Sequence, residues 1–312
     1  MKYIYTIMIV LLLLGLSDNN DSEVIANETS DAVDITDVIL KKRTANCADY
    51  VNNYKSSVQD VNRQLSFQGN FSVSVSGDKC IFTSNAIPNH NFNDGESTFV
   101  TNVSEQNVKY EVNTNPQKAS KNTELSLTTD NAIFLNGVKL DLLSAGCYGV
   151  GDGKIGCSDI TQPWRFDPMS SLSNFNIDSH NAHTQGDGTY HYHGSPVALF
   201  DSNNAVVSPV IGFAADGFPI FGSYFDDNGT IRKAKSSYQL KKGRRRAIKG
   251  INPGGRYDGR YRNDYRYVAG SGDLDECNGM TINGVYGYFV TESYPWVIGC
   301  FKGTPDSSFN KS

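Results

Sequence analysis

The spacing of apolar residues changes near Leu65. Between Ala48 and Leu65 apolar residues recur every three or four positions, which predicts an amphipathic helix over 48–65. The positions concerned are Val51, Tyr54, Val58, Val61 and Leu65. Further on the period becomes two, as in 71–75 and 108–112, which is typical of strands with one buried face.

Short turn pairs between apolar runs predict β-hairpins, because Asn, Asp and Gly tolerate the backbone angles of tight turns. The pairs are Asn136-Gly137 between 132–135 and 138–142, Asn283-Gly284 between 280–282 and 285–290, and Asp216-Gly217 within 206–221. We therefore expect a mainly β chain, with one sandwich-like or barrel-like domain over 46–312 and the helix packed outside it. An α+β domain is the alternative.

The first seventeen residues have the features of an export signal, with a positive start, an apolar run over 4–14 and small residues before Asp18. The apolar run is shorter than the about 20 residues of a membrane span, and no later run is long enough. We expect a secreted or periplasmic protein without a membrane span, beginning near Asp18. Residues 18–45 are polar and suit a linker or weakly ordered leader.

The six cysteines favour disulfides, because an even number in an exported chain seldom leaves free thiols. None lies in a CxxC pair, so a thiolate zinc site has little support. Six cysteines allow 15 pairings. Neighbourhood in sequence favours Cys147–Cys157, Cys277–Cys300 and Cys47–Cys80.

A net charge of −5 argues against nucleic acid as a partner. The basic run Lys241-Lys-Gly-Arg-Arg-Arg246 is the local exception. We expect it to be a solvated loop, since short charge runs usually mark exposed segments. A contact with an anionic polymer and a protease-sensitive site are the alternatives.

Four of the five histidines fall between His180 and His193. An extended backbone places His191 and His193 on one face of a strand, where both imidazoles could bind one metal ion. Tyr190 and Tyr192 would then lie on the opposite face.

The other two histidines of the cluster, His180 and His183, are three apart and would lie side by side in a tight turn. A reversal at Gly186-Asp187-Gly188 could bring the two pairs together. His90 could complete a zinc or copper site from a distance, and a turn histidine is the alternative for it. Ordinary surface or core histidines are the competing interpretation of the cluster.

Acidic residues near glycines could assist such a centre by ligating, orienting a histidine or accepting a proton. The catalytic candidates are Asp216 and Glu276, and Asp216 could equally be a plain turn residue. The Gly-rich segment 149–159 lacks calcium-loop spacing and suits a disulfide-closed turn. Motifs of serine hydrolases, HExxH zinc enzymes and nucleotide-binding loops are absent from the sequence.

Several short motifs in order resemble the YHYH-domain family of mostly exported proteins. The resemblance extends from about residue 80 to the C-terminus. Its motifs are Ile87-Pro-Asn-His90, Ser179-His-Asn-Ala-His183, Tyr190-His-Tyr-His193, Asp216-Gly-Phe-Pro-Ile220, Asp273-Leu-Asp-Glu-Cys-Asn-Gly279 and Tyr294-Pro-Trp-Val-Ile-Gly-Cys300. The family resemblance itself implies no particular activity.

Two functional hypotheses follow from the histidine cluster. The first is an exported metal-binding protein that acts as a zinc-dependent hydrolase or a copper-dependent oxidoreductase. The second is a non-enzymatic secreted module that sequesters metal or recognises a small molecule, a polysaccharide or a protein. An exchangeable metal-bound water would favour the first, and a closed four-ligand site the second.

Overall fold

The computed structural model describes residues 31–151, 153–203 and 205–311. The expected export signal and the start near Asp18 lie outside these ranges. The described residues from Ala32 onward belong to one compact unit. No helix within the described ranges is long and apolar enough to cross a membrane.

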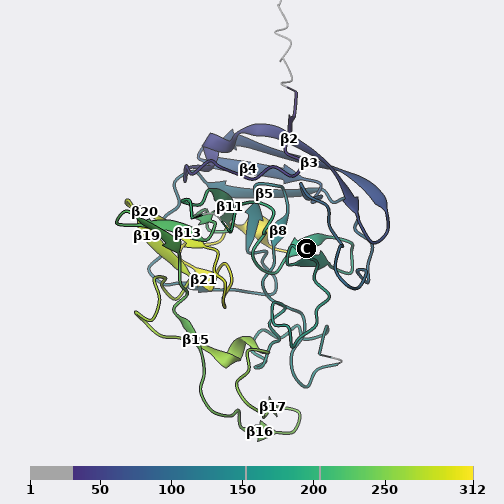
Figure 1. Cartoon of the computed structure of the whole chain (residues 1–312), viewed down its shortest axis with the longest axis vertical. Coiled ribbons are helices and arrows are strands. Elements are labelled where there is room, and N and C mark those ends of the chain that lie inside the picture. Colours follow the sequence, from purple (N-terminus) through teal and green to yellow (C-terminus); the bar gives the residue numbers. More distant parts are fainter. Residues whose placement is uncertain (1–30, 152, 204, 312) are drawn as a thin grey trace, which may run out of the picture. The chain divides into compact units, whose positions relative to one another are not determined.

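The first of two large sheets has five strands in the order β1-β2-β3-β4-β5 (Figure 1). Its strands are β1 Val33–Asp34, β2 Asn52–Asp60, β3 Leu65–Ser76, β4 Lys79–Ser84 and β5 Val108–Asn113. β1 pairs with β2 in parallel, and the other neighbours are antiparallel. The period of two over 71–75 and 108–112 is thus confirmed as strands.

The helix expected over 48–65 is wrong, since this segment is the short 3-10 helix η1 Cys47–Tyr50 followed by β2 and the start of β3. The inward positions of β2 include two polar residues, Ser56 and Asp60. Ser56 donates to the Pro88 carbonyl and Asp60 accepts from the Asn93 amide. These buried hydrogen bonds replace apolar contacts, so the strand lacks an apolar period of two.

The second sheet has eight strands in the order β19-β20-β12-β11-β7-β8-β10-β9. They are β7 Ala132–Phe134, β8 Lys139–Leu140, β9 Ala182–Thr184, β10 Tyr190–Tyr192, β11 Val210–Ala214, β12 Pro219–Phe221, β19 Gly279–Ile282 and β20 Val285–Phe289. All three predicted hairpins are confirmed, as β7–β8, β11–β12 and β19–β20. The pairs β8–β10 and β12–β20 are parallel.

The two large sheets share one hydrophobic core, which gives a sandwich-like rather than barrel-like arrangement. Phe82 of β4 packs against Phe213 of β11 with ring centroids 5.8 Å apart. In Figure 1 the sheet β2–β5 lies over β11 and β8. The mainly β fold class is therefore confirmed, and the α+β alternative is not needed.

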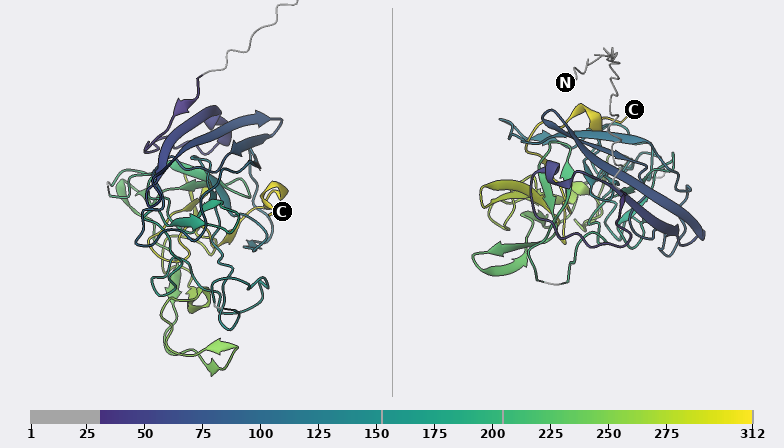
Figure 2. Two further views of the ribbon diagram at one scale, coloured as in Figure 1. Left: turned by 90° about the vertical axis from the view of Figure 1, so that its right-hand side faces the viewer. Right: turned by 90° about the horizontal axis from the view of Figure 1, so that it is seen from above.

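Short elements complete the described part of the chain. They are the pairs β6 Thr123–Glu124 with β21 Cys300–Phe301, β13 Tyr224–Asp227 with β14 Thr230–Lys233, β15 Tyr238–Leu240 with β18 Tyr265–Tyr267, and β16 Ala247–Ile248 with β17 Asn252–Pro253, and the 3-10 helices η2 Arg262–Asp264 and η3 Ser307–Phe309. The hairpin β16–β17 extends away from the two large sheets (Figure 2).

Residues 32–45 lie along the domain instead of forming a linker. Ile35 is buried and its backbone N–H donates to the Lys55 carbonyl. The Leu40 N–H donates to the Leu199 carbonyl. The expected domain boundary at residue 46 is therefore too late.

The three disulfides are Cys47–Cys80, Cys147–Cys157 and Cys277–Cys300, as predicted. The second one closes the Gly-rich segment, which confirms a disulfide-closed turn there. All six cysteines are paired.

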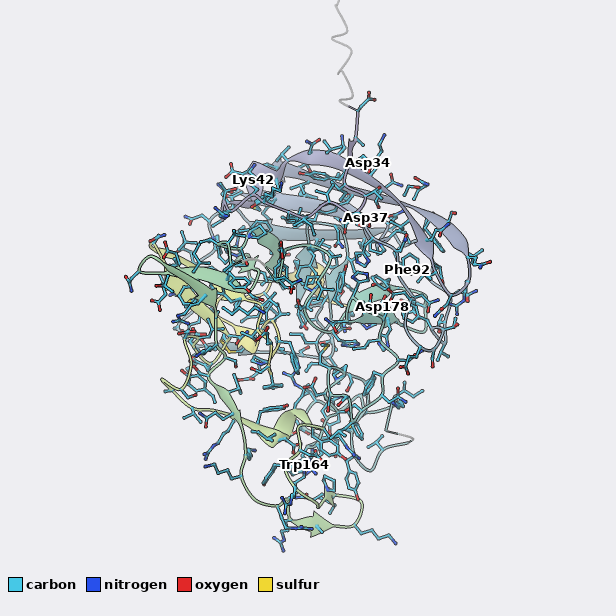
Figure 3. The ribbon with its side chains drawn as sticks, in the orientation of Figure 1. Asp34, Asp37, Lys42, Phe92, Trp164 and Asp178 are labelled. Carbon is cyan, nitrogen blue, oxygen red and sulfur yellow. A yellow bond between two sulfur atoms is a disulfide. The ribbon has the colours of Figure 1, made fainter. Side chains whose placement is uncertain are left out.

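The basic run over 241–246 is only partly a solvated loop. Arg245 is buried, pairs with Asp264 at 2.6 Å and also with Asp258, and lies over the Tyr261 ring. Trp164, labelled in Figure 3, lies beside the same guanidinium. Arg244 and Arg246 are exposed. One cation of the run therefore serves as a buried anchor.

Candidate metal centre

The antiparallel hairpin β9–β10 brings three histidines to one face. His183 on β9 lies directly opposite His191 on β10. His193 follows two residues later, and its N–H donates to the Asn181 carbonyl. The chain reverses between Gln185 and Thr189, where Gly188 has a φ of 86° that suits glycine. The predicted reversal therefore brings His183 close to His191 and His193.

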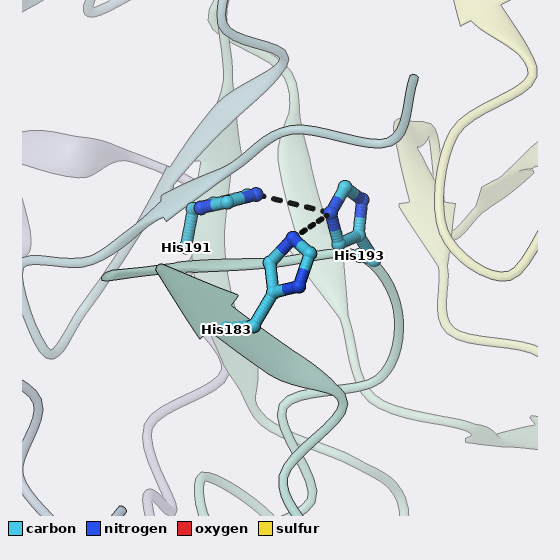
Figure 4. A group of neighbouring side chains, drawn as sticks. All are labelled: His183, His191 and His193. Atoms are coloured by element: carbon cyan, nitrogen blue, oxygen red, sulfur yellow. Dashed lines mark hydrogen bonds between the residues drawn. The ribbon is translucent and has the colours of Figure 1, made fainter. Parts of the chain in front are cut away.

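The Nε2 atoms of the three imidazoles converge (Figure 4). His193 Nε2 lies 3.0 Å from His191 Nε2 and 3.0 Å from His183 Nε2. The donor atoms of the group lie within 4.8 Å of one another. In the part of the chain that the structure describes, this is the one group of three or more His, Cys, Asp or Glu side chains placed to hold a metal ion.

Backbone carbonyls fix the tautomers of two of these rings. His183 Nδ1 lies 2.8 Å from the Phe175 carbonyl, and His191 Nδ1 lies 3.3 Å from the Thr189 carbonyl. A carbonyl can only accept, so both Nδ1 atoms carry the hydrogen. Each neutral ring then directs an Nε2 lone pair toward His193. Histidines that bind metals commonly donate their other N–H to a carbonyl in this way.

Burial keeps the three rings neutral. It is the largest cause that lowers the pKa of His183 and holds the pKa values of His191 and His193 well below the usual range. The neighbouring imidazoles lower the pKa values of His191 and His193 further. Neutral imidazole is the form that ligates metals, so little proton competition opposes binding near pH 7.

The other two predicted ligands, His90 and His180, form a separate pair. Their ring centroids are 3.8 Å apart. His180 precedes β9 in a turn and Asn181 has a φ of 64°, so the chain changes direction before His183. His90 is buried, with Nδ1 2.8 Å from the Asn91 carbonyl and Nε2 2.6 Å from the Tyr192 hydroxyl. Sequence spacing alone did not separate the two groups.

Both tyrosines of the Tyr-His-Tyr-His motif point away from the converging Nε2 atoms, as the strand geometry predicted. Tyr190 donates to Asp178 at 2.8 Å, and Figure 3 labels Asp178 near Phe92, whose ring packs on Tyr190. Tyr192 accepts from Asn136 at 2.9 Å and donates to His90. Since both hydroxyls are buried and bonded, the tyrosines anchor the strand.

A cleft of about 790 Å³, called the histidine cleft below, opens beside the three histidines. Its described lining includes the apolar side chains Phe99, Val100, Leu127, Leu143, Ile155 and Phe175 and the polar side chains Asp141, Gln185 and Lys311. The disulfide-closed turn supplies Ile155 and Cys157 to one wall. His183, His191 and His193 also belong to the lining of this cleft.

A charged network supports the cleft wall. Asp141 accepts from Gln185 at 2.9 Å and from Lys311 at 2.5 Å. Asp130 pairs with Lys139 at 3.0 Å and lies 3.7 Å from Lys311. Burial raises the pKa of Asp141, and Lys311 opposes that shift. Two carboxylates and two ammonium groups thus balance one another.

The two acidic residues that the sequence suggested as catalytic candidates do not line the histidine cleft. Asp216 is buried and accepts from the Tyr288 hydroxyl and the Gly303 N–H at 2.5 and 2.8 Å. Glu276 pairs with Lys302 at 3.2 Å. The described lining of the histidine cleft contains neither of them.

Sequence reasoning missed the acid that does line the cleft, Asp141. The available signal was its place in 138–143, where charged Lys139 and Asp141 interrupt an apolar run within a predicted hairpin. Buried charges of this kind need partners and so mark structured polar sites.

Comparisons with known proteins identify the family of the chain. No curated protein and no solved structure matches the chain. A family model described as YHYH protein matches residues 109–303. The matched span includes His183, His191 and His193, whereas His90 and strands β1–β4 precede it. The family match covers more than half of the sequence, and the chain therefore belongs to the YHYH protein family.

Proposed function

We propose that the protein binds one divalent metal ion through Nε2 of His183, His191 and His193. The observation that carries this proposal is the convergence of three neutral imidazoles, two of which have their N–H groups bonded to carbonyls. Lone pairs directed at one another in a buried place repel unless a proton or a cation lies between them. His90 and His180 are outside the proposed ligand set.

The spacing suits a tetrahedral ion. Zinc–nitrogen bonds of about 2.0–2.1 Å place two ligand nitrogens about 3.3 Å apart in a tetrahedron. Two of the observed separations are 3.0 Å. The donor atoms all lie within 4.8 Å of one another, so binding would require side-chain rotations that shorten the widest separation. Three protein ligands would leave one ligand position for water or a substrate group, as in catalytic zinc sites.

Among metal-dependent activities, the surroundings favour zinc-type hydrolysis over copper-type oxidation. A zinc ion in such a site supplies a water of lowered pKa and polarises a bound carbonyl. The phenols that would neighbour a redox copper, Tyr190 and Tyr192, point to the opposite face and are bonded there. Asp141 is the carboxylate within the described lining of the cleft.

Metal analysis tests the binding proposal. Full-length protein from an oxidising compartment, stripped and reloaded separately with zinc and copper, should retain about one ion per chain. The double variant His191→Ala/His193→Ala should retain none while its circular dichroism stays native. His180→Ala is the matched control and should load like the wild type. Full occupancy in the double variant, or an empty wild type, would overturn the proposal.

An exchangeable bound water and turnover of an ester or amide would support the hydrolase. Metal held in a closed site without turnover would assign the protein to the alternative, metal sequestration. Cobalt substitution distinguishes these cases, because the visible absorption of Co²⁺ responds to the number of ligands.

We also propose that the protein is exported. The three disulfides support an oxidising compartment. Non-reducing mass spectrometry of secreted material should find a chain that starts near Asp18 and has no thiol that can be alkylated. Two or more alkylated cysteines in native protein would contradict this proposal.

A further inference from the structure

We infer that the histidine cleft binds a small organic carboxylate with an apolar body, oriented with its carboxylate toward the three histidines. The inference rests on the proposed metal function and specifies the ligand class of that site. Its grounds are the volume and walls of the cleft, its rim, and the charge of the proposed centre.

The volume and walls fit a small molecule. Ligand pockets typically measure about 300–1,000 Å³ and are mostly apolar with a few convergent polar groups. The histidine cleft has about 790 Å³, and Phe99, Leu127, Leu143 and Phe175 contribute apolar walls. Hydroxyl and amide side chains, among them Thr101, Asn174 and Asn176, also belong to the lining and supply its polar groups.

The rim extends the apolar surface into solvent. Val100 is 97% exposed and Ile155 is 70% exposed, the two highest values among the large hydrophobic side chains that the structure describes. Single exposed apolar residues are ordinary. Here both lie on the same cleft, one from the segment before β5 and one from the disulfide-closed turn. An apolar ligand body would cover both side chains and remove their surface from water.

The charge of the centre selects an anion. The three proposed ligands are neutral, the network of Asp130, Lys139, Asp141 and Lys311 balances to zero, and Lys154 adds a positive charge to the lining. A divalent ion would therefore keep its charge in a buried, low-dielectric place, where a charge without a partner is costly. An anionic ligand at the open position would offset that charge.

A carboxylate fits the cleft better than a phosphate. Phosphate recognition usually employs arginine forks or several backbone N–H donors. The described lining of the histidine cleft contains no arginine, and its two lysines are already bonded, Lys311 to Asp141 and Lys154 to the Ser173 carbonyl. A carboxylate needs fewer donors, and one of its oxygens could be held by the metal ion.

Three probes separate the parts of this inference. Full-length protein loaded with Co²⁺ is titrated with 4-phenylbutyrate, its neutral counterpart 4-phenylbutanol, and acetate. Visible absorption and calorimetry report binding. We expect 4-phenylbutyrate to bind at least tenfold more tightly than either comparison compound and to change the Co²⁺ spectrum. Equal affinities, or binding without a spectral change, would overturn the inference.

Rim variants provide a second readout. Ile155→Ser and Val100→Ser should each lower the affinity for 4-phenylbutyrate three- to tenfold and leave the affinity for acetate unchanged. Ile251→Ser is the matched control, because Ile251 is also well exposed but is outside the described cleft lining. Equal effects of all three variants would contradict a ligand body at the rim.

The two proposals fail in different ways. A protein that takes up no metal fails the proposed function, and the ligand inference fails with it. A protein that holds one ion per chain but shows no preference for 4-phenylbutyrate fails the ligand inference alone.

Discussion

The protein contains two groups of histidines on opposite sides of the strand β10. His183, His191 and His193 direct their Nε2 atoms at one another beside an open cleft. The rings of His90 and His180 lie against each other with their planes tilted by 34°, and both ring nitrogens of His90 are bonded to protein groups. Histidines that lie close in sequence therefore have different surroundings.

Their hydrogen-bond partners explain the difference. In the first group, carbonyls hold the Nδ1 hydrogens of His183 and His191 and leave their Nε2 lone pairs directed toward His193. In the pair, the Tyr192 hydroxyl donates to His90 Nε2, so that lone pair is already used. A group of histidines becomes a candidate ligand set when its lone pairs converge and have no protein donor.

The largest expected effect is a loss of zinc affinity, and it should occur in only one of the two histidine groups. His183→Ala should weaken zinc affinity at least 100-fold, because it leaves two protein ligands. His90→Ala should change zinc affinity less than threefold, since His90 is bonded elsewhere. Competition with a chromophoric chelator measures both variants. Equal losses in the two variants would show that the groups form a single site.

The next effect distinguishes the two faces of β10. Tyr192→Ala should lower the free energy of unfolding by about 3–5 kcal/mol, as for other large buried side chains. Tyr192→Phe should cost about 1–3 kcal/mol, because His90 and Asn136 lose their partner. His191→Ala should cost less than Tyr192→Ala in metal-free protein. Urea unfolding measures the series, and the reverse order would make His191 the structural anchor.

Residues near one another in sequence were the predictable part of the fold and the site. The hairpins, the disulfide pairs and the shared face of His191 and His193 involve residues at most 33 positions apart. Turn residues and strand alternation determine such contacts locally. The glycines at 186 and 188 also predicted the chain reversal that brings His183 opposite His191.

Contacts between distant segments were not predictable. His90 meets Tyr192 across 102 positions, and Lys311 meets Asp141 across 170. The inward Ser56 and Asp60 of β2 are satisfied by the segment around Pro88 and Asn93, so an apolar pattern could not identify that strand. Tertiary hydrogen bonds of this kind override local pattern.

Acid should destabilise the protein through the buried pair. Burial, followed by the charge of His180, lowers the pKa of His90 to about 3. The unfolded chain takes up this proton near pH 6.5, whereas the folded chain does so only near pH 3. The contribution of neutral His90 to the free energy of unfolding is therefore fully present above pH 6.5 and decreases as the pH falls toward 3. Between pH 7 and 4.5, the free energy of unfolding of His90→Gln should fall by about 2.5 kcal/mol less than that of the wild type.

Denaturant unfolding of metal-free protein at a series of pH values checks this difference. The other histidines remain in both proteins, so the difference reports His90 together with its contact to His180. Parallel pH profiles would contradict a neutral, buried His90.

The smallest effect is expected at His180, the other member of the pair. Its Nδ1 atom is buried and has no hydrogen-bond partner within the described residues. Removing a buried polar group without a partner costs little, because its desolvation penalty is removed too. His180→Ala should therefore change the free energy of unfolding by less than about 1 kcal/mol, mainly through the lost contact with the His90 ring. Thermal unfolding and zinc titration of His180→Ala test this, and a loss of zinc binding there would return His180 to the ligand set.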